Sequence, residues 1–118
     1  MRSYRHQLNA SDTLIRDGLI QRFKVTYEVS CRTLKRYLEA TSANPAEPDA
    51  MPFQDLIRSG NERGLLREDW PVWRKYRDMR SRTSHTYSED VAVQVVSGIP
   101  DFLEEAAYLW QRLNEANT

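Results

Sequence analysis

Apolar residues that recur at steps of three and four between Leu19 and Leu38 are the feature that most constrains the fold. The positions are Leu19, Phe23, Tyr27, Cys31, Leu34 and Leu38. This spacing places them on one side of an α-helix, which then needs a partner surface to bury that side. Ser11 or Asp12 is a suitable N-cap, and the pattern ends near Ala40. We therefore expect a long amphipathic helix, preceded by a poorly patterned lead-in at residues 1–11 that is either frayed or the remnant of a helix.

Two further long helices are expected in the second half of the chain. Asp69 is a suitable N-cap and Pro71 fits a first helical turn. The helix that follows carries Trp70, Trp73, Tyr76 and Met79 at helical spacing. These side chains suit a core, although tryptophans also stack on nucleic-acid bases. The last helix is expected to start near Ser88, Glu89 and Asp90. Its apolar face would contain Val91, Val95, Ile99, Phe102, Leu103, Ala106, Leu109, Trp110 and Leu113.

Proline and glycine mark the remaining boundaries. Thr41–Pro52 contains three prolines with serine, asparagine and aspartate, which indicates a loop. Phe53–Ser59 is expected to form a short helix, and Pro100 to kink the last helix. The sequence thus predicts one all-α domain over residues 1–118. It would be an up-down bundle of three long helices and one short helix, with the last helix kinked near Pro100.

Composition narrows the possible functions. Lys and Arg number 17 and Asp and Glu also 17, so net charge does not indicate a strongly basic nucleic-acid binder. The single cysteine, Cys31, excludes an internal disulfide and suits a small core residue better than a nucleophile. Two histidines and one cysteine offer no plausible metal cluster, so we expect no metal and no cofactor. With neither an apolar run long enough for a bilayer nor a signal peptide, a cytoplasmic protein without membrane contact is expected.

A local basic cluster precedes the most informative motif. Arg74, Lys75, Arg77, Arg80 and Arg82 fall within nine residues. They suit RNA contacts, with Arg77, Arg82 and the nearby Ser84 as candidate substrate-binding residues, or they form a solvated helix face. His85 follows Arg80 by five residues and precedes Tyr87 by two. The hydroxyl side chains around His85 favour leaving the helix near Thr83, which would place His85 in a connection between two helices.

Arg80 and His85 together suit one kind of chemistry. A histidine with an ordinary pKa near 6.5 gives and takes protons near neutral pH. An arginine presents a cationic fork to phosphate oxygens. The pair therefore suits attack of a ribose 2′-hydroxyl on the adjacent phosphate, with His85 moving the proton and Arg80 stabilising the added negative charge. The alternative is structural, with both side chains tying down the helix connection through hydrogen bonds.

Three stretches together resemble the HEPN superfamily, and within it the bacterial nucleotidyltransferase substrate-binding family. They are Arg16–Leu38, Leu56–Trp73 and Arg80–Tyr87, the last of which looks like the family's R-x4-H-x-Y signature. The resemblance implies a helical bundle that forms homodimers. It also implies a metal-independent endoribonuclease of a type VII toxin–antitoxin pair, with Arg80 and His85 from two subunits facing one cleft.

The resemblance further implies regulation by a partner protein. The partner is a minimal nucleotidyltransferase antitoxin that transfers AMP from ATP to the motif tyrosine, here Tyr87. A different function, a non-catalytic subunit that presents a substrate to the nucleotidyltransferase, also stays open, as does a plain helical dimerisation module. Arg16 and Asp17 occupy a family-like position, but surface ion pairing explains them equally well.

Overall fold

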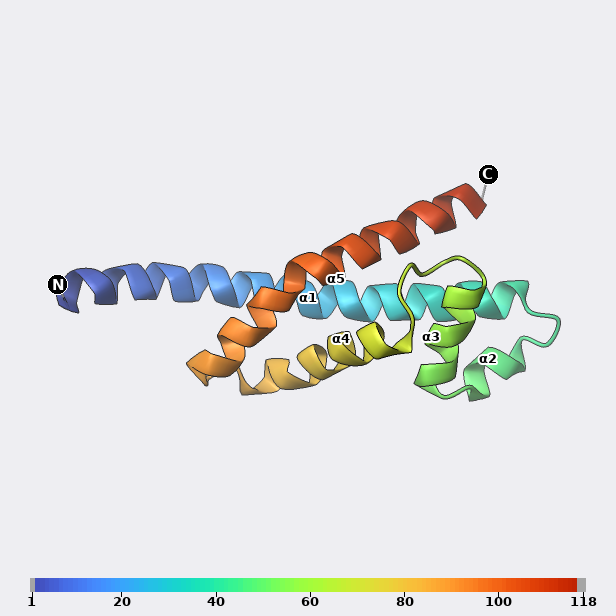
Figure 1. Cartoon of the computed structure of the whole chain (residues 1–118), viewed down its shortest axis with the longest axis horizontal. Coiled ribbons are helices and arrows are strands. Elements are labelled where there is room, and N and C mark those ends of the chain that lie inside the picture. The colour runs from blue at the N-terminus through green and yellow to red at the C-terminus, as the bar shows by residue number, and fades with distance from the viewer. Residues whose placement is uncertain (1, 117–118) are drawn as a thin grey trace.

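The chain folds as an elongated bundle of helices (Figure 1). The computed structural model describes the backbone of residues 2–116 and the side chains of residues 12–116. Within that range the elements are α1 (Arg2–Thr41), α2 (Ala46–Ala50), α3 (Phe53–Glu62), α4 (Trp70–Arg82), the 3-10 helix η1 (Thr83–His85) and α5 (Glu89–Ala116). The predicted all-α bundle is confirmed, with α1, α4 and α5 as its long helices.

The predicted boundary at Ser11 or Asp12 is wrong, because α1 runs without interruption from Arg2. No glycine or proline lies between Arg2 and Ala10, so nothing in the backbone stops the helix from extending past the suitable cap. Of the two alternatives for the lead-in at residues 1–11, the structure therefore agrees with the helical one from residue 2 onward.

The predicted loop from Thr41 to Pro52 contains the short helix α2. Pro45 precedes it with φ of −61°, a value that suits the start of a helix. Glu47 and Asp49 lie in its first turn, where the helix dipole favours negative charge. Pro45 thus marks the start of the short helix α2 within the segment that was predicted to be a loop.

Aromatic side chains from three helices form the centre of the core. The ring of Phe102 on α5 lies between Phe23 and Tyr27 of α1 and Trp73 and Tyr76 of α4, with centroid distances of 5.1 to 5.9 Å. The predicted core role of Trp73 and Tyr76 is confirmed by their burial, and Trp70 and Met79 pack partly buried against the same core. The pairs of Phe102 with Phe23, Trp73 and Tyr76 meet edge to face, which adds to the stabilisation that burial gives.

The predicted apolar faces of α1 and α5 need correction. Leu19 is 43% exposed, and Leu103 and Trp110 are 47% and 39% exposed. On α1 the neighbouring Ile20 is buried instead, and Ser30 is buried beside the half-buried Cys31. A residue step turns a helix by about 100°, so spacing alone leaves the centre of the buried face uncertain by one position.

Helix α5 contains Pro100 and remains one element. The ring of Pro100 takes the place of the backbone N–H that would bond to the carbonyl of Val96, so a bend is expected here. Figure 1 shows α5 changing direction between its first part and its red second part. None of the helices within residues 2–116 has the length and apolar character needed to cross a bilayer.

A buried carboxylate on α5 fixes the segment between α3 and α4. Glu105 is fully buried, and its oxygens accept hydrogen bonds from the backbone N–H groups of Arg67 and Glu68, at 3.1 and 2.8 Å. The indole Nε1 of Trp73 donates to the same side chain at 2.9 Å. These three donors compensate for the removal of the carboxylate from water, so the start of α4 is held in place.

Candidate functional site

The segment between α4 and α5 leaves the α-helix at Thr83, as the sequence predicted. Its hydroxyl side chains bond to nearby backbone carbonyls. Thr83 Oγ1 donates to the carbonyl of Arg80 at 2.6 Å, Ser84 Oγ to that of Ser81 at 3.0 Å, and Thr86 Oγ1 to that of Thr83 at 3.4 Å. These bonds satisfy carbonyls that the helix end leaves free, and they hold His85 and Tyr87 on a short, defined turn.

Arg80 lies in the last turn of α4 and is held from two sides. Its Nε donates to Glu28 Oε1 on α1 at 3.1 Å, and its Nη2 donates to the same oxygen. Its Nη1 donates to Thr83 Oγ1 at 3.1 Å. The hydrogen bond and the charge of Arg80 lower the pKa of the Glu28 carboxyl. The guanidinium is therefore oriented, while 30% of its side chain stays accessible to a ligand.

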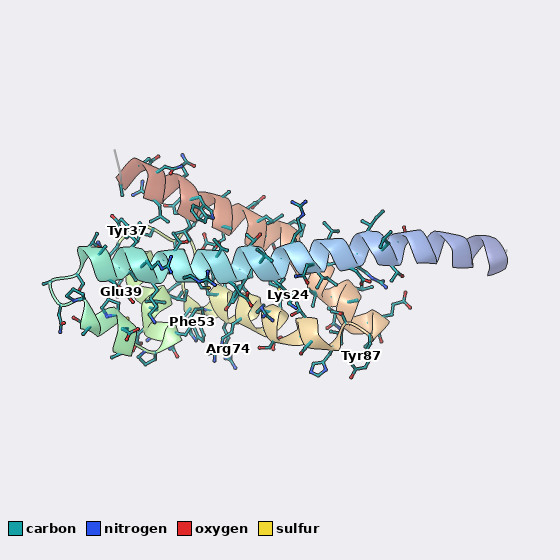
Figure 2. All side chains as sticks on the ribbon, turned by 180° about the vertical axis from the view of Figure 1, so that it is seen from behind. Lys24, Tyr37, Glu39, Phe53, Arg74 and Tyr87 are labelled. Carbon is teal, nitrogen blue, oxygen red and sulfur yellow. The ribbon has the colours of Figure 1, made fainter. Side chains whose placement is uncertain are left out.

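His85 and Tyr87 both lie on the surface. Their rings meet edge to face, with centroids 6.0 Å apart and an interplanar angle of 74°. Tyr87 is 86% exposed and projects from the edge of the bundle (Figure 2). Among the residues whose side chains are described, the structure brings His85 to Tyr87, whereas the contacts of the Arg80 guanidinium are with Glu28 and Thr83.

The three predicted substrate-binding residues have separate local roles. The guanidinium of Arg77 lies 5.7 Å from the centroid of the Phe53 ring. Arg82 donates to Gln94 on α5 and lies 3.9 Å from Asp78. Ser84 bonds to the backbone as described above. Arg77 and Ser84 stay exposed and Arg82 half-exposed, so their contact with a substrate remains a prediction.

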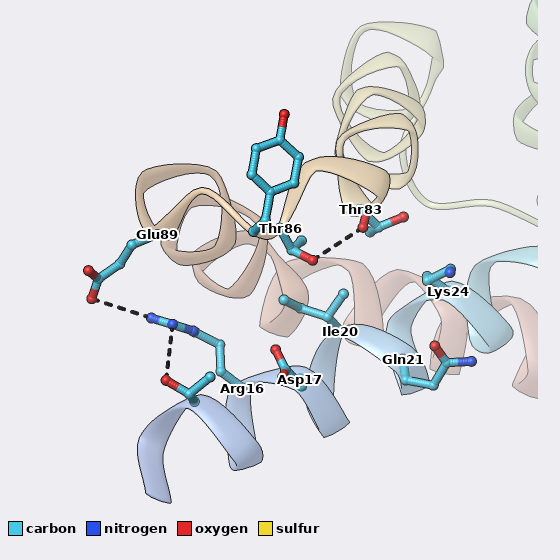
Figure 3. Close-up of a pocket in the computed structure, with 10 residues that line it drawn as sticks. Arg16, Asp17, Ile20, Gln21, Lys24, Thr83, Thr86 and Glu89 are labelled. Atoms are coloured by element: carbon cyan, nitrogen blue, oxygen red, sulfur yellow. Dashed lines mark hydrogen bonds and ion pairs between the residues drawn. The ribbon is translucent and has the colours of Figure 1, made fainter. Parts of the chain in front are cut away.

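A polar cleft of about 550 Å³ lies beside this turn (Figure 3). The cleft lies between α1 on one side and η1 with the start of α5 on the other, and the exposed Tyr87 is one of its lining residues. Its lining residues are Thr13, Arg16, Asp17, Ile20, Gln21, Lys24, Thr83, Thr86, Tyr87 and Glu89. Arg16 lies 3.8 Å from Glu89 across the cleft and donates to Thr13 at 3.5 Å. Its Nε is buried and has no hydrogen-bond partner among the described atoms.

Cys31 lies one helical turn from Glu28 on α1, packs against the core and does not line the cleft. Burial raises the pKa of its thiol to about 12. A thiol in that environment stays protonated at neutral pH and is a poor nucleophile. The interpretation of Cys31 as a small core residue agrees with this environment.

Sequence reasoning singled out Arg16 and Asp17, which line the cleft, but missed Glu28, Lys24 and the contact of Thr83 with Arg80. Glu28 and Lys24 stood out only as charged residues on the polar side of a helix. Their one available signal was a series of steps of three and four residues from Asp17 through Ile20 to Lys24 and Glu28, which aligns them along one side of α1. Which element faces that side depends on tertiary packing.

Comparison with known proteins decides the family. Residues 1–115 match the family described as nucleotidyltransferase substrate binding protein like. The chain belongs to this family. Members similar to it include the Haemophilus influenzae protein named probable ribonuclease HepT. The two are 41% identical over 106 residues, which cover 90% of this chain and 71% of that protein.

A solved structure in the same family supports the fold. It comes from Haemophilus influenzae and is described as showing the fold of a substrate binding domain of a nucleotidyltransferase. It superposes with a TM-score of 0.85 at 36% identity, over 90% of this chain and 78% of that one. The resemblance inferred from the three sequence stretches is thereby confirmed for the nucleotidyltransferase substrate-binding family, and the helical fold is consistent with HEPN proteins.

Proposed function

We propose that this protein is a metal-independent endoribonuclease in which Arg80 and His85 act on the scissile phosphodiester. The observation that carries the proposal is the orientation of the Arg80 guanidinium by Glu28 and Thr83. The exposed His85 follows Arg80 by five residues, on the turn after α4. A family relative named probable ribonuclease HepT supports this class of activity.

The proposed reaction needs only a proton carrier and a fixed cation. The 2′-oxygen of the RNA forms a bond to the adjacent phosphorus while the bond from phosphorus to the 5′-oxygen breaks. His85 takes the 2′-hydroxyl proton, and an imidazolium returns a proton to the leaving 5′-oxygen. Arg80 stabilises the additional negative charge on the phosphoryl oxygens. The products carry a 2′,3′-cyclic phosphate and a 5′-hydroxyl.

We further propose that two copies of the chain form the active unit, so that both Arg80–His85 turns face one cleft. Exposed apolar side chains at this end of the bundle support the proposal. Leu14, Ile15 and Val93 are 76%, 63% and 51% exposed. Leu14 and Ile15 directly precede Arg16 on α1, and Val93 follows Glu89 by one helical turn on α5; the Arg16–Glu89 pair links the two helices here. Burying such side chains against a second copy would stabilise a dimer.

The proposed regulator is a minimal nucleotidyltransferase antitoxin that modifies Tyr87, as in a type VII toxin–antitoxin pair. The Tyr87 hydroxyl would give up its proton to a base of the nucleotidyltransferase, its oxygen would bond to the α-phosphorus of ATP, and pyrophosphate would leave. The 86% exposure of Tyr87 makes its hydroxyl accessible to another protein. With its ring only 6.0 Å from that of His85, an added phosphate would repel and obstruct RNA at the reacting groups.

Cleavage of single-stranded RNA by the purified protein in the presence of a chelator tests the proposal. We expect products with cyclic phosphate ends, and loss of cleavage in His85→Ala and Arg80→Ala. Arg58→Ala, an exposed arginine on α3, serves as a control that retains cleavage. Undiminished cleavage by His85→Ala would contradict the mechanism.

A second candidate is a non-catalytic subunit that presents a substrate to the nucleotidyltransferase. The family description and that of the solved structure favour it. It predicts a stable complex with the nucleotidyltransferase, no RNA cleavage, and an unchanged mass at Tyr87 after incubation with that enzyme and ATP. An added mass of one or more AMP groups on Tyr87 would favour the toxin.

A further inference from the structure

The polar cleft beside Tyr87 has one wall built from a single side of α1. Arg16, Ile20 and Lys24 line it at steps of four residues, about 6 Å apart along the helix axis. Glu28, the residue that holds Arg80, is the next step along the same side. The residue that follows the cleft-lining side chains on this side of α1 is therefore the one that binds the Arg80 guanidinium.

The opposite wall also connects to Arg80. Thr83 lines the cleft and its Oγ1 accepts the hydrogen bond from Arg80 Nη1 at 3.1 Å. Thr86 and Tyr87 continue this wall toward the surface. A ligand in the cleft would thus lie next to the groups proposed to bind the scissile phosphate.

The polar groups of the cleft are mixed in sign. Arg16 and Lys24 are cations, whereas Asp17 and Glu89 are anions. Glu89 already pairs with Arg16 at 3.8 Å, so Asp17 is the carboxylate available to a ligand, and its charge would repel a bare phosphate. A nucleotide offers a phosphate to the cations, and the amino group of an adenine, cytosine or guanine base donates to carboxylates.

Two further properties fit an occupant of this class. The volume of about 550 Å³ lies within the usual range for small-molecule sites. Arg16 Nε is a buried donor without a partner among the described atoms. Buried donors nearly always have an acceptor, and a shift of the Arg16 side chain toward a bound ligand would supply one.

We propose that this cleft is a nucleotide-binding subsite next to Arg80. The proposal rests on the proposed function, because it names what the same site binds beside the reacting phosphate. The nucleotide comes either from the RNA strand, adjacent to the scissile bond, or from the AMP transferred to Tyr87 at the edge of the cleft. In the second case the transferred AMP lies in the cleft beside Arg80 and adds negative charge next to the scissile phosphate, so that the proposed modification would oppose cleavage.

Binding of short single-stranded RNA to protein carrying His85→Ala separates this proposal from catalysis. In that background we compare Lys24→Ala and Asp17→Asn with Arg36→Ala, an exposed arginine on the same helix about 18 Å along its axis from Lys24. Fluorescence anisotropy with labelled RNA gives Kd at several salt concentrations. Thermal unfolding followed by circular dichroism confirms that each variant is folded.

Lys24→Ala should weaken RNA binding about tenfold, because a charge-assisted hydrogen bond is lost. The slope of log K against log salt should fall by about 0.7, the value for one phosphate contact on a single strand. Asp17→Asn should leave that slope unchanged and reduce the preference for oligoadenylate and oligocytidylate over oligouridylate. Arg36→Ala should bind as the His85→Ala parent does.

A titration with free AMP, followed by NMR of the wild-type protein and of the Lys24→Ala, Asp17→Asn and Arg36→Ala variants, distinguishes the two sources. Weaker AMP binding in Lys24→Ala with unchanged RNA binding assigns the cleft to the transferred nucleotide, and weaker RNA binding assigns it to the RNA strand. Binding of both probes by Lys24→Ala and Asp17→Asn at the level of Arg36→Ala would overturn the subsite. If wild-type protein leaves RNA uncut, the ribonuclease proposal fails while the AMP titration still tests the cleft.

Discussion

Glu28 holds the guanidinium of Arg80 across the contact between α1 and α4. Its Oε1 accepts a hydrogen bond from Nε at 3.1 Å and a second from Nη2. The two residues are 52 positions apart in the chain. The first helix of the bundle therefore orients the cation at the end of the fourth, and Glu28 is a positioning residue for any reaction that uses Arg80.

RNA cleavage should depend on this contact if the proposed activity is present. We expect Glu28→Ala to lower kcat about tenfold or more with little change in KM, because a misoriented cation loses most of its effect in the transition state. Glu28→Gln keeps an acceptor oxygen and should lose less. The measurement is single-turnover and steady-state cleavage, with the exposed Glu47→Gln as a control. Wild-type kinetics in Glu28→Ala would mean that Thr83 alone orients Arg80.

The same pair should make stability depend on pH. Arg80 lowers the pKa of Glu28 in the folded state, so the folded protein holds the charged form more strongly than the unfolded chain does. The stabilisation is then present above the ordinary glutamate pKa of about 4.3 and is lost as pH falls through the lower folded value. The difference in Tm between wild type and Glu28→Gln should shrink from neutral pH to about pH 3. A difference that stays constant would show that charge does not contribute.

Glu105 should be among the costliest positions to neutralise. Glu105→Gln retains the shape but replaces one acceptor oxygen with an amide that opposes an N–H donor. We expect the free energy of unfolding to fall by about 2–3 kcal/mol. Urea denaturation measures the change, and Glu104→Gln, whose side chain is 70% exposed beside Arg67, should change it by less than about 0.5 kcal/mol. Equal effects at the two positions would contradict the role assigned to the buried carboxylate.

Two glycines in helices should respond in opposite directions to alanine. Gly18 lies in α1 with no atom within 4 Å of an added Cβ, so Gly18→Ala should raise the free energy of unfolding by about 0.5–1 kcal/mol. At Gly60 the added Cβ would lie 3.1 Å from Leu66 Cδ1 and 3.2 Å from Leu34 Cδ1. Both leucines are buried, so Gly60→Ala should lower it by about 1 kcal/mol. Stabilisation by Gly60→Ala would show that the core there can relax.

The helices could be predicted because their signals are local. Asp69 accepts a hydrogen bond from the backbone N–H of Trp70 and starts α4 where the sequence predicted. The turn at Thr83 follows from hydroxyl side chains that bond to carbonyls three residues earlier. The start of α1 could not be placed, because a favourable cap at Ser11 or Asp12 does not end a helix that has no reason to stop.

The arrangement of the site was less predictable. The motif placed Arg80, His85 and Tyr87 in one short segment. It did not indicate that the guanidinium of Arg80 would donate hydrogen bonds to Glu28 and Thr83. Nor did it indicate that Arg16 and Lys24 would line a cleft next to these residues. The burial of Ile20 in place of Leu19 has the same origin, because the direction in which α1 faces its neighbours is a property of the whole bundle.

The sequence by itself determined the all-α class, the long helices, the turn that carries His85 and the family to which the chain belongs. Only the tertiary structure decided what surrounds that turn: the carboxylate that holds Arg80, the exposure of Tyr87 and the polar cleft between α1 and α5. The physical reason is range, since helix periodicity and capping act over about four residues. Contacts such as Glu28 with Arg80 join residues that meet only when the helices pack.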